Sequence, residues 1–114
     1  MQGRLNLFQC AMLRWRQLHP YCAAHVIRIA APLDAARLES RIAGALEAMG
    51  LTGYALDAGA RRFEWSGGPA RVAVPVQDGG ASPLERAALE IETLINRPFP
   101  EGGAFDPFRF FAVR

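Results

Sequence analysis

The final stretch of this 114-residue chain, FDPFRFFAVR, is its most hydrophobic segment and constrains the fold more than any other. In an extended conformation, Phe108 and Phe110 point to one side while Phe111 and Val113 point to the other. A strand that is apolar on both faces is typical of a sheet interior covered on both sides. Burying four such side chains is worth roughly 6–12 kcal/mol, which is comparable to the whole net stability of an ordinary domain, about 5–15 kcal/mol. This strand must therefore be covered by something.

Length and composition place the chain among globular proteins. With 114 residues it is long enough for one domain with its own core and too short for two. Its residues are 51% hydrophobic and 21% charged, a balance that excludes a disordered chain. We therefore expect residues 1–114 to form a single domain.

The charges give no reason to expect a nucleic-acid partner. All thirteen basic residues are arginines, scattered among eleven acidic residues for a net charge of +2, with no basic run or aromatic stacking motif. The N-terminal segment lacks the uninterrupted apolar core of a signal peptide, and no apolar run approaches the roughly 20 residues needed to span a bilayer. We expect a soluble cytoplasmic protein with no membrane partner.

The first elements are predicted to be a helix and a strand. Apolar residues at spacings of three and four predict a helix that buries one face and ends near His19, because Pro20 disfavours helical geometry in the residue before it. The residues of this face are Leu5, Phe8, Met12 and Trp15. The next segment, AHVIRIA, predicts a strand over Ala24–Ala30.

A second helix is marked by both of its ends. Asp34 can accept hydrogen bonds from the first free amides, and Gly50 supplies a left-handed stop. The stripe predicted to be buried between them consists of Leu38, Ile42, Leu46 and Met49.

The middle of the chain is predicted to be rich in strands. TGYALD and RRFEW read as short strands on either side of a turn over Asp57–Ala60, with Phe63 and Trp65 on one face. Val72, Val74 and Val76 then alternate as in a further strand, in which Pro75 indicates an edge position or a strand end.

The third helix is predicted from the segment SPLE. Ser82 can cap it, Pro83 suits its first position, and Glu85 completes a capping box. The helix ends at NRPFP, and its expected buried stripe consists of Leu84, Ala88, Ile91 and Ile95. The resulting order, α-β-α-β-β-β-α-β, predicts an α+β fold, namely a two-layer sandwich of about three helices on a mostly antiparallel or mixed sheet of about five strands.

Three stretches follow one another as NLFQCAMLRW with LHPYCAAHVIRI, then APLDAARLESRIAGAL, then LINRPFP with DPFRFFAV. In this order they resemble the N-terminal half of the condensation domains of peptide synthetases and related acyltransferases, which share the two-lobed chloramphenicol-acetyltransferase-like fold. The first is similar to the family's helix with Gln and Trp that leads into its first strand. The second resembles the G-x-L-D-x-x-x-L helix, and the third resembles the R-P-F segment with its following strand. The matching residues of the second and third stretches are Pro32, Leu33, Asp34, Leu38, Arg97, Pro98, Phe99, Pro107 and Arg109.

The resemblance spans nearly the whole chain and implies the N-terminal lobe of a condensation-like acyltransferase. That family transfers an acyl group from a carrier-bound or CoA thioester to an amine or alcohol. The second histidine of its His-His-x-x-x-Asp-Gly signature activates or orients the nucleophile. In the family this signature follows the strand that FRFFAV resembles; it is absent here, and AMGLTGYALD replaces the family's Arg-His-Glu segment.

The resemblance thus implies a chain that is catalytically incomplete by itself, with no catalytic residue, metal or cofactor of its own. The partners it implies are a C-terminal lobe of the same fold, on the same or a separate chain, and an acyl-carrier protein. The rival hypothesis is a stand-alone α+β binding or assembly module that forms a homodimer through its apolar surface.

Residues able to carry chemistry are few. Cys10, His19, Cys22 and His25 match no compact zinc-site spacing. The two cysteines are expected to be free thiols of a reducing compartment rather than a disulfide. Cys22 and His25 would face opposite sides of a strand, so a nucleophile–base pair, as in a small hydrolase, requires this segment to be a loop.

The remaining candidates have structural interpretations. His19 is expected at a helix C-terminus, where a protonated imidazole would interact favourably with the free carbonyl groups. His25 is expected to be packed with Ile27 and Ile29. Arg97 is expected to close the third helix, with pairing to a carboxylate as the alternative. Trp15, Trp65 and the C-terminal phenylalanines are core candidates, or interface candidates if exposed together. The glycine-rich segments SGGP and EGGAF read as turns.

Overall fold

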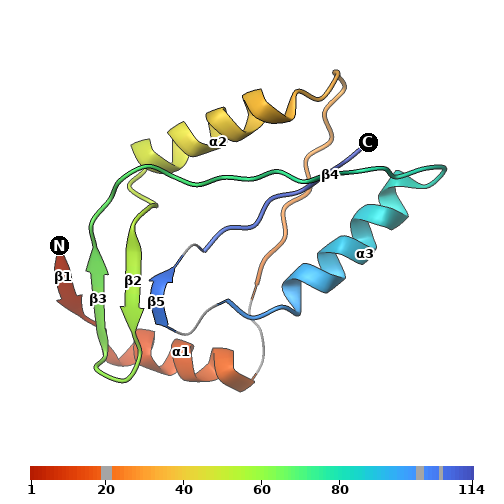
Figure 1. The fold of residues 1–114 in the computed structure, drawn as a ribbon. Coiled ribbons are helices and arrows are strands. Elements are labelled where there is room, and N and C mark those ends of the chain that lie inside the picture. Colours follow the sequence, from red (N-terminus) through yellow and green to blue (C-terminus); the bar gives the residue numbers. More distant parts are fainter. Residues whose placement is uncertain (19–21, 100–101, 106) are drawn as a thin grey trace.

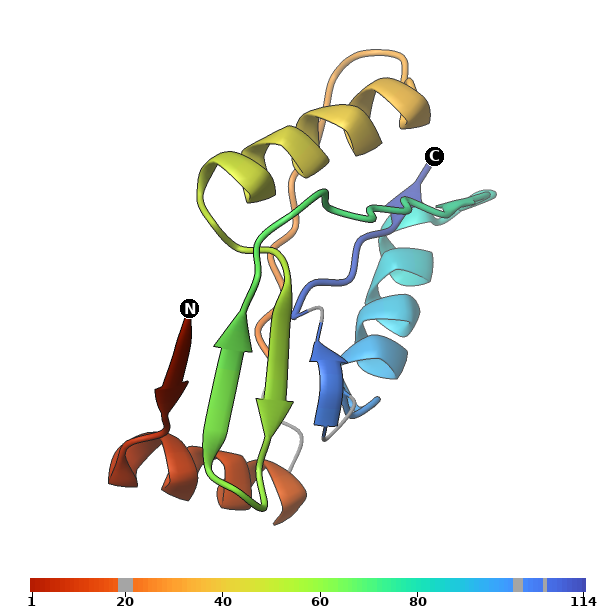
Figure 2. The ribbon, with the colours of Figure 1, turned by 60° about the vertical axis from the view of Figure 1, so that its left-hand side comes forward.

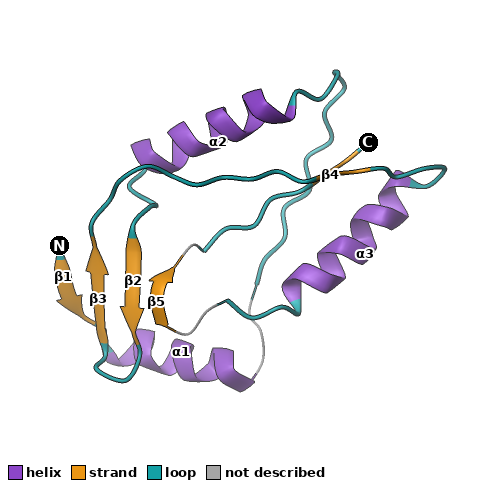
Figure 3. Ribbon diagram, in the orientation of Figure 1, coloured by secondary structure: helices purple, strands orange, loops and turns teal. Residues whose placement is uncertain are grey.

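The computed structural model describes residues 1–18, 22–99, 102–105 and 107–114 and shows an α+β fold. Figure 3 shows its helices and strands. In chain order the elements are β1 (Gln2–Arg4), α1 (Leu7–Leu18), α2 (Ala35–Ala48), β2 (Tyr54–Asp57), β3 (Arg62–Trp65), β4 (Val76–Gln77), α3 (Pro83–Ile95), β5 (Gly102–Phe105) and β6 (Ala112–Val113).

The main sheet has four strands in the order β1-β3-β2-β5, and every neighbouring pair is antiparallel. The β2–β3 hairpin at its centre confirms the two strands and the turn predicted around Asp57–Ala60. In Figures 1 and 2 helix α1 crosses one end of these strands, α2 lies toward their other end, and α3 lies beyond β5. Strand β1 was not predicted; it occupies the free edge of β3.

The hairpin is closed by a close approach of two backbone segments. Ser66 donates its amide hydrogen to the Gly53 carbonyl over 2.9 Å. Gly53 has φ +69°, and a Cβ atom there would collide with the backbone of Gly67. Only glycine combines this left-handed conformation with such close contact.

The second sheet is a short parallel pair, in which Val76 of β4 lies opposite Ala112 of β6. The predicted terminal strand is therefore correct only over Ala112–Val113, and residues 107–111 lie outside any strand. None of the described strands pairs with them, although their side chains are half-buried. Phe108 and Phe110 do share a side, because their rings stack with centroids 6.2 Å apart and 18° between planes.

The strand predicted over Ala24–Ala30 is absent, and the whole segment is a loop. None of the described strands pairs with it, although the outer edges of β1 and β5 carry no further strand. The β-forming sequence of this segment thus has no strand beside it. The described order of elements is accordingly β-α-α-β-β-β-α-β-β.

Helix α2 forms as predicted at both ends. The Asp34 carboxylate accepts a hydrogen bond from the Arg37 amide over 3.0 Å, which confirms the cap. Gly50 has φ +67°, which confirms the left-handed stop. Leu46 is buried, whereas Met49 is 70% exposed because it is the C-terminal cap rather than a member of the inner stripe.

Residues 70–75 run beside α2 instead of forming the predicted strand. Val74 donates its amide hydrogen to the Glu39 carboxylate over 2.7 Å, and Ala70 donates to the Glu47 carboxylate over 2.8 Å. Glutamate carboxylates thus accept the amide hydrogens that a neighbouring strand would accept in a sheet. Pro75 directly precedes β4, which confirms that it marks a strand end.

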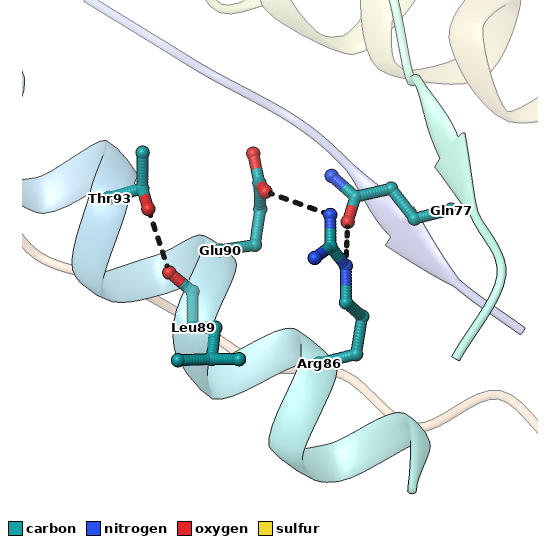
Figure 4. A network of polar contacts seen from close by, with 5 residues as sticks. All are labelled: Gln77, Arg86, Leu89, Glu90 and Thr93. Atoms are coloured by element: carbon teal, nitrogen blue, oxygen red, sulfur yellow. Dashed lines mark hydrogen bonds and ion pairs between the residues drawn. The ribbon is translucent and has the colours of Figure 1, made fainter. Parts of the chain in front are cut away.

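Helix α3 starts at Pro83, as predicted, but its capping box is not formed. The Ser82 side chain makes no capping hydrogen bond, and Leu84 and Ala88 of the expected buried stripe are exposed. In Figure 4 the helix is joined to β4 by a hydrogen bond of 2.6 Å from Arg86 Nε to the Gln77 side-chain oxygen. Arg86 also lies 3.9 Å from the carboxylate of Glu90.

Little apolar surface is buried within the described parts of the chain. Leu46 and Val74 are the buried hydrophobic side chains there. The accessible surface is 8795 Å², whereas a compact protein of this mass exposes about 6,200 Å². The radius of gyration is 16.2 Å, against about 13 Å for a compact domain of this length. The fold is an open one.

The two N-terminal caps allow a matched test. Asp34→Ala removes a capping bond and should lower the free energy of unfolding by about 0.5–2 kcal/mol. Ser82→Ala removes no such bond and should change it by less than about 0.5 kcal/mol. Urea denaturation of the two variants measures both values, and equal losses would contradict the assignment.

Candidate interaction surface

Helix α1 exposes its apolar side. Leu7 is 86% exposed and Phe8 is 72% exposed, contrary to the prediction that the Phe8 face is buried. We call the exposed set the α1 apolar stripe; it consists of Leu7, Phe8, Met12, Trp15 and Leu18. At 100° per residue these five positions fall within about 140° of the helix circumference. The stripe is thus a continuous apolar surface.

Contacts on the opposite side of α1 fix this orientation. Cys10 and Leu13 are half-buried there. Leu5, just before the helix, donates its amide hydrogen to the Arg61 carbonyl of the β2–β3 turn over 2.8 Å. Arg16 donates to the Phe99 carbonyl over 2.5 Å. The helix is therefore held at both ends with the stripe facing outward.

The start of α1 carries a capping signal that the sequence analysis missed. Gln9 donates its amide hydrogen to the Asn6 side chain over 2.8 Å, and Asn6 donates its own to the Gln9 side chain over 2.9 Å. This reciprocal pair is a capping box, readable in the sequence as Asn-x-x-Gln.

The loop over residues 22–34 exposes further apolar side chains. Val26, Ile27 and Ile29 are exposed, with Ile27 at 81%. His25 is exposed too, so the prediction that it packs with Ile27 and Ile29 is wrong. The reason is again the missing strand, because a loop has no sheet face against which to bury these residues.

Two open hollows border α1, each with a volume of about 310 Å³. The apolar hollow lies beside the stripe and is lined by Leu5, Phe8, Gln9, Met12, Leu13, Arg16 and Leu56. The second, which we call the arginine hollow, faces the β2–β3 turn and is lined by Cys10, Leu13, Arg14, Arg16, Ala58, Gly59 and Arg61. Helix α1 thus presents an apolar surface and a cationic surface next to each other.

Arg109, in the C-terminal segment, links that segment to the end of helix α3. Its guanidinium donates to the carbonyls of Leu94 (2.8 Å), Arg97 (2.6 Å) and Pro98 (2.8 Å). It also lies 3.9 Å from the centre of the Phe99 ring, a cation–π distance. Arg109 therefore closes α3, a role that the sequence analysis gave to Arg97. The Arg97 side chain is exposed, and Arg97 contributes its backbone carbonyl to this contact.

The candidate chemical residues do not assemble into a site. Cys10 and Cys22 are free thiols, both half-buried. Cys22 and His25 lie in a loop, as a nucleophile–base pair would require, but within the described residues no hydrogen bond joins them. No group of three His, Cys, Asp or Glu that could hold a metal occurs among the residues described, and His19 lies outside them.

Comparison of the chain with protein-family models, with curated proteins and with solved structures finds no match. Among the described residues no helix combines the length and apolarity needed to cross a bilayer.

The geometry around Arg109 predicts that lysine cannot replace it. Arg109→Lys keeps the charge but loses the fork that reaches three carbonyls, and should lower the free energy of unfolding by about 1–3 kcal/mol. Arg97→Lys, at the exposed neighbour, should stay within about 0.5 kcal/mol. Chemical denaturation checks both variants, and a larger loss for Arg97→Lys would contradict the assignment.

The fluorescence of each tryptophan, measured separately, tests whether the stripe is exposed. Trp15 is 59% exposed, whereas Trp65 is half-buried and its indole nitrogen is buried without a hydrogen-bond partner among the described residues. Acrylamide should quench Trp15 fluorescence, measured in Trp65→Phe, several-fold more strongly than Trp65 fluorescence, measured in Trp15→Phe. Equal quenching at low protein concentration would show that the stripe is covered.

Proposed function

We propose that this chain is the N-terminal lobe of a condensation-like acyltransferase and that it supplies structure and surface to a companion lobe. The single observation that carries this proposal is the apolar surface left uncovered. The chain exposes 8795 Å², about 2,600 Å² more than a compact protein of its mass. Standard protein interfaces bury only about 800 Å² per partner. The excess, which counts polar and apolar surface together, is larger than one such interface covers and leaves room for a companion lobe.

The arrangement of the resembling segments also supports the proposal. Arg109, in the DPFRFFAV stretch, binds the carbonyls of Arg97 and Pro98 in the R-P-F stretch. Asp34, from the L-D-x-x-x-L stretch, caps the helix that it precedes. Positions that the resemblance singles out thus take part in structural contacts. The two-layer lobe of the chloramphenicol-acetyltransferase-like fold belongs to the same proposal.

The proposed chemistry assigns the catalytic base to the companion lobe. In the family reaction an amine or alcohol attacks the thioester carbonyl carbon, the C–S bond breaks, and a C–N or C–O bond forms. The acceptor's proton passes to a histidine, which gives it to the departing thiolate so that a free thiol is released. The two histidines of this chain, His19 and His25, are not adjacent and do not form the paired signature. An acyl-carrier protein that delivers the thioester is a second proposed partner.

A homodimeric binding module is the second candidate, and the α1 apolar stripe favours it. Five exposed apolar side chains on one helix are a surface that a second copy could cover symmetrically. In this case the apolar surface would be buried by self-association.

Sedimentation velocity with a dye that reports exposed apolar surface tests the two candidates against each other. The measurement spans roughly a hundredfold range of concentration, because dimerisation obeys mass action. For a lobe without its companion we expect a monomer that binds the dye. Phe8→Gln in the stripe should reduce dye binding, whereas Arg41→Gln at an exposed position of α2 should not.

Other outcomes would remove one or both candidates. A tight dimer without dye binding would favour the module, and a compact dye-negative monomer would contradict both. The coding sequence beyond the Arg114 codon gives an independent readout. A His-His-x-x-x-Asp-Gly signature within a few dozen codons would support the acyltransferase lobe.

A further inference from the structure

We propose that the α1 apolar stripe and the positively charged segment that carries it bind the surface of an anionic lipid bilayer, with the helix lying in the plane of the interface. A helix in this position needs an apolar side that enters the lipid boundary and positive charge that attracts the headgroups. This inference goes beyond the acyltransferase proposal and does not depend on it. It leaves the other exposed apolar surface of the chain to a companion lobe.

The exposed apolar side chains and the positive charge belong to the same part of the chain. Of the thirteen large apolar side chains that are exposed within the described ranges, nine belong to residues 1–33. These 33 residues contain four arginines and no aspartate or glutamate. The remainder of the chain contains nine arginines against eleven acidic residues. The excess of positive charge therefore accompanies the exposed apolar side chains and is not spread over the protein.

Within α1 the two kinds of side chain are arranged as an interfacial helix requires. At 100° per residue, the positions of Arg14 and Arg16 lie within about 40° of the two borders of the stripe. Arg14 is exposed, whereas Arg16 is half-buried and bound to the Phe99 carbonyl. An arginine at the border can lay its stem along the lipid boundary while its guanidinium reaches the headgroups. Trp15 and Phe8 are in the stripe, and rings of this kind are favoured on the apolar side of such helices.

Helix α1 also lies where a flat surface can reach it. It crosses one end of the sheet, and in Figures 1 and 2 helices α2 and α3 lie farther from this end of the molecule. The β2–β3 turn at the same end carries Arg61 and Arg62, both exposed. Asp57, before the turn, accepts the Ala60 amide hydrogen over 2.8 Å. Residues 57–62 thus add one further net positive charge beside the helix.

The charge of residues 1–33 favours a bilayer over a second copy of the chain as the occupant of the stripe. A symmetric dimer through α1 would bring two arginine-bearing, acid-free segments together, and like charges across an interface oppose binding. An anionic bilayer offers the opposite charge over a wide area.

Binding at the bilayer surface does not require a spanning segment. Helix α1 has 12 residues and is about 18 Å long, whereas the hydrocarbon core of a bilayer is about 30 Å thick. The expected absence of a membrane partner was inferred from the lack of a spanning segment, so it does not apply to a helix that lies on the surface.

The fluorescence of Trp15, measured in Trp65→Phe with lipid vesicles, tests the proposal on the 114-residue chain at low salt. Vesicles of phosphatidylcholine with about one-third phosphatidylserine should shift the emission to shorter wavelength, because the indole ring leaves water. Vesicles of phosphatidylcholine alone should bind at least about tenfold more weakly, because they lack the attraction between arginines and anionic headgroups. Added salt should weaken binding to the anionic vesicles.

Two variants in this background test the apolar and the charged part of the surface separately. Phe8→Gln should weaken binding at least about tenfold, because an apolar ring no longer enters the lipid. Arg14→Gln should weaken binding to anionic vesicles about fivefold. The matched controls are Leu84→Gln, at a side chain of α3 that is 77% exposed, and Arg41→Gln, at an exposed position of α2. Both controls should bind like the parent, and circular dichroism should show the same helix content in all four variants.

The proposal would be overturned by a parent chain that binds neither kind of vesicle, or that binds both equally. Losses in the two controls as large as those in Phe8→Gln and Arg14→Gln would also overturn it, because binding would then follow total charge and apolarity. Polyglutamate that shifts Trp15 emission more strongly than anionic vesicles would replace the bilayer with an acidic protein partner. A dimer in sedimentation that binds no vesicles would assign the stripe to a second copy. None of these outcomes bears on acyl transfer.

Discussion

Outside the four-stranded sheet, polar contacts from single side chains hold the parts of this chain together. Glu39 and Glu47 bind backbone amides of residues 70–75, and Arg109 binds three carbonyls at the end of α3. Such bonds contribute about 0.5–3 kcal/mol each, depending on charge. They position the helices, but they do not replace a core. The exposed apolar surface follows from this construction.

Where the determinants are local, the sequence predicts the structure well. Asp34 and Gly50 mark the ends of α2 through bonds and dihedral angles set within a few residues. The turn between β2 and β3 forms for the same reason. Leu46 was correctly predicted to be buried, and Val74, whose amide is bonded to Glu39 of α2, is buried as well.

Sequence-based prediction fails where contacts with a segment distant in the sequence determine the structure. The segment Ala24–Ala30 has the composition of a strand, but a strand needs a neighbour, and none of the described strands pairs with this segment. The α1 helix itself was predicted correctly, whereas its buried face was not, because contacts with the Arg61 carbonyl and Phe99 choose that face. Periodicity identifies an apolar side of a helix. It does not say what that side will meet.

Sequence-based prediction of the candidate sites is limited for the same reason, because contacts with distant segments determine them. Sequence inspection directed attention to Cys10, Cys22 and His25, since these side chains carry chemistry in many proteins. The structure instead draws attention to arginines, whose roles depend on the surrounding fold. Nothing in the local sequence distinguishes Arg61 from its neighbour Arg62, but only Arg61 has a left-handed backbone and faces the hollow.

The parallel pairing of β4 with β6 affects the order in which the chain can fold during synthesis. The β2–β3 hairpin can close as soon as it is made, because its strands are adjacent in sequence. Strand β4 must wait for residues 112 and 113, which are made after the whole of α3. At usual rates this wait is roughly 2–7 s. During that interval the edge of β4 is unpaired and the amphipathic helix α3 is undocked, so both are exposed in the nascent chain. Exposed surfaces of this kind are what chaperones bind.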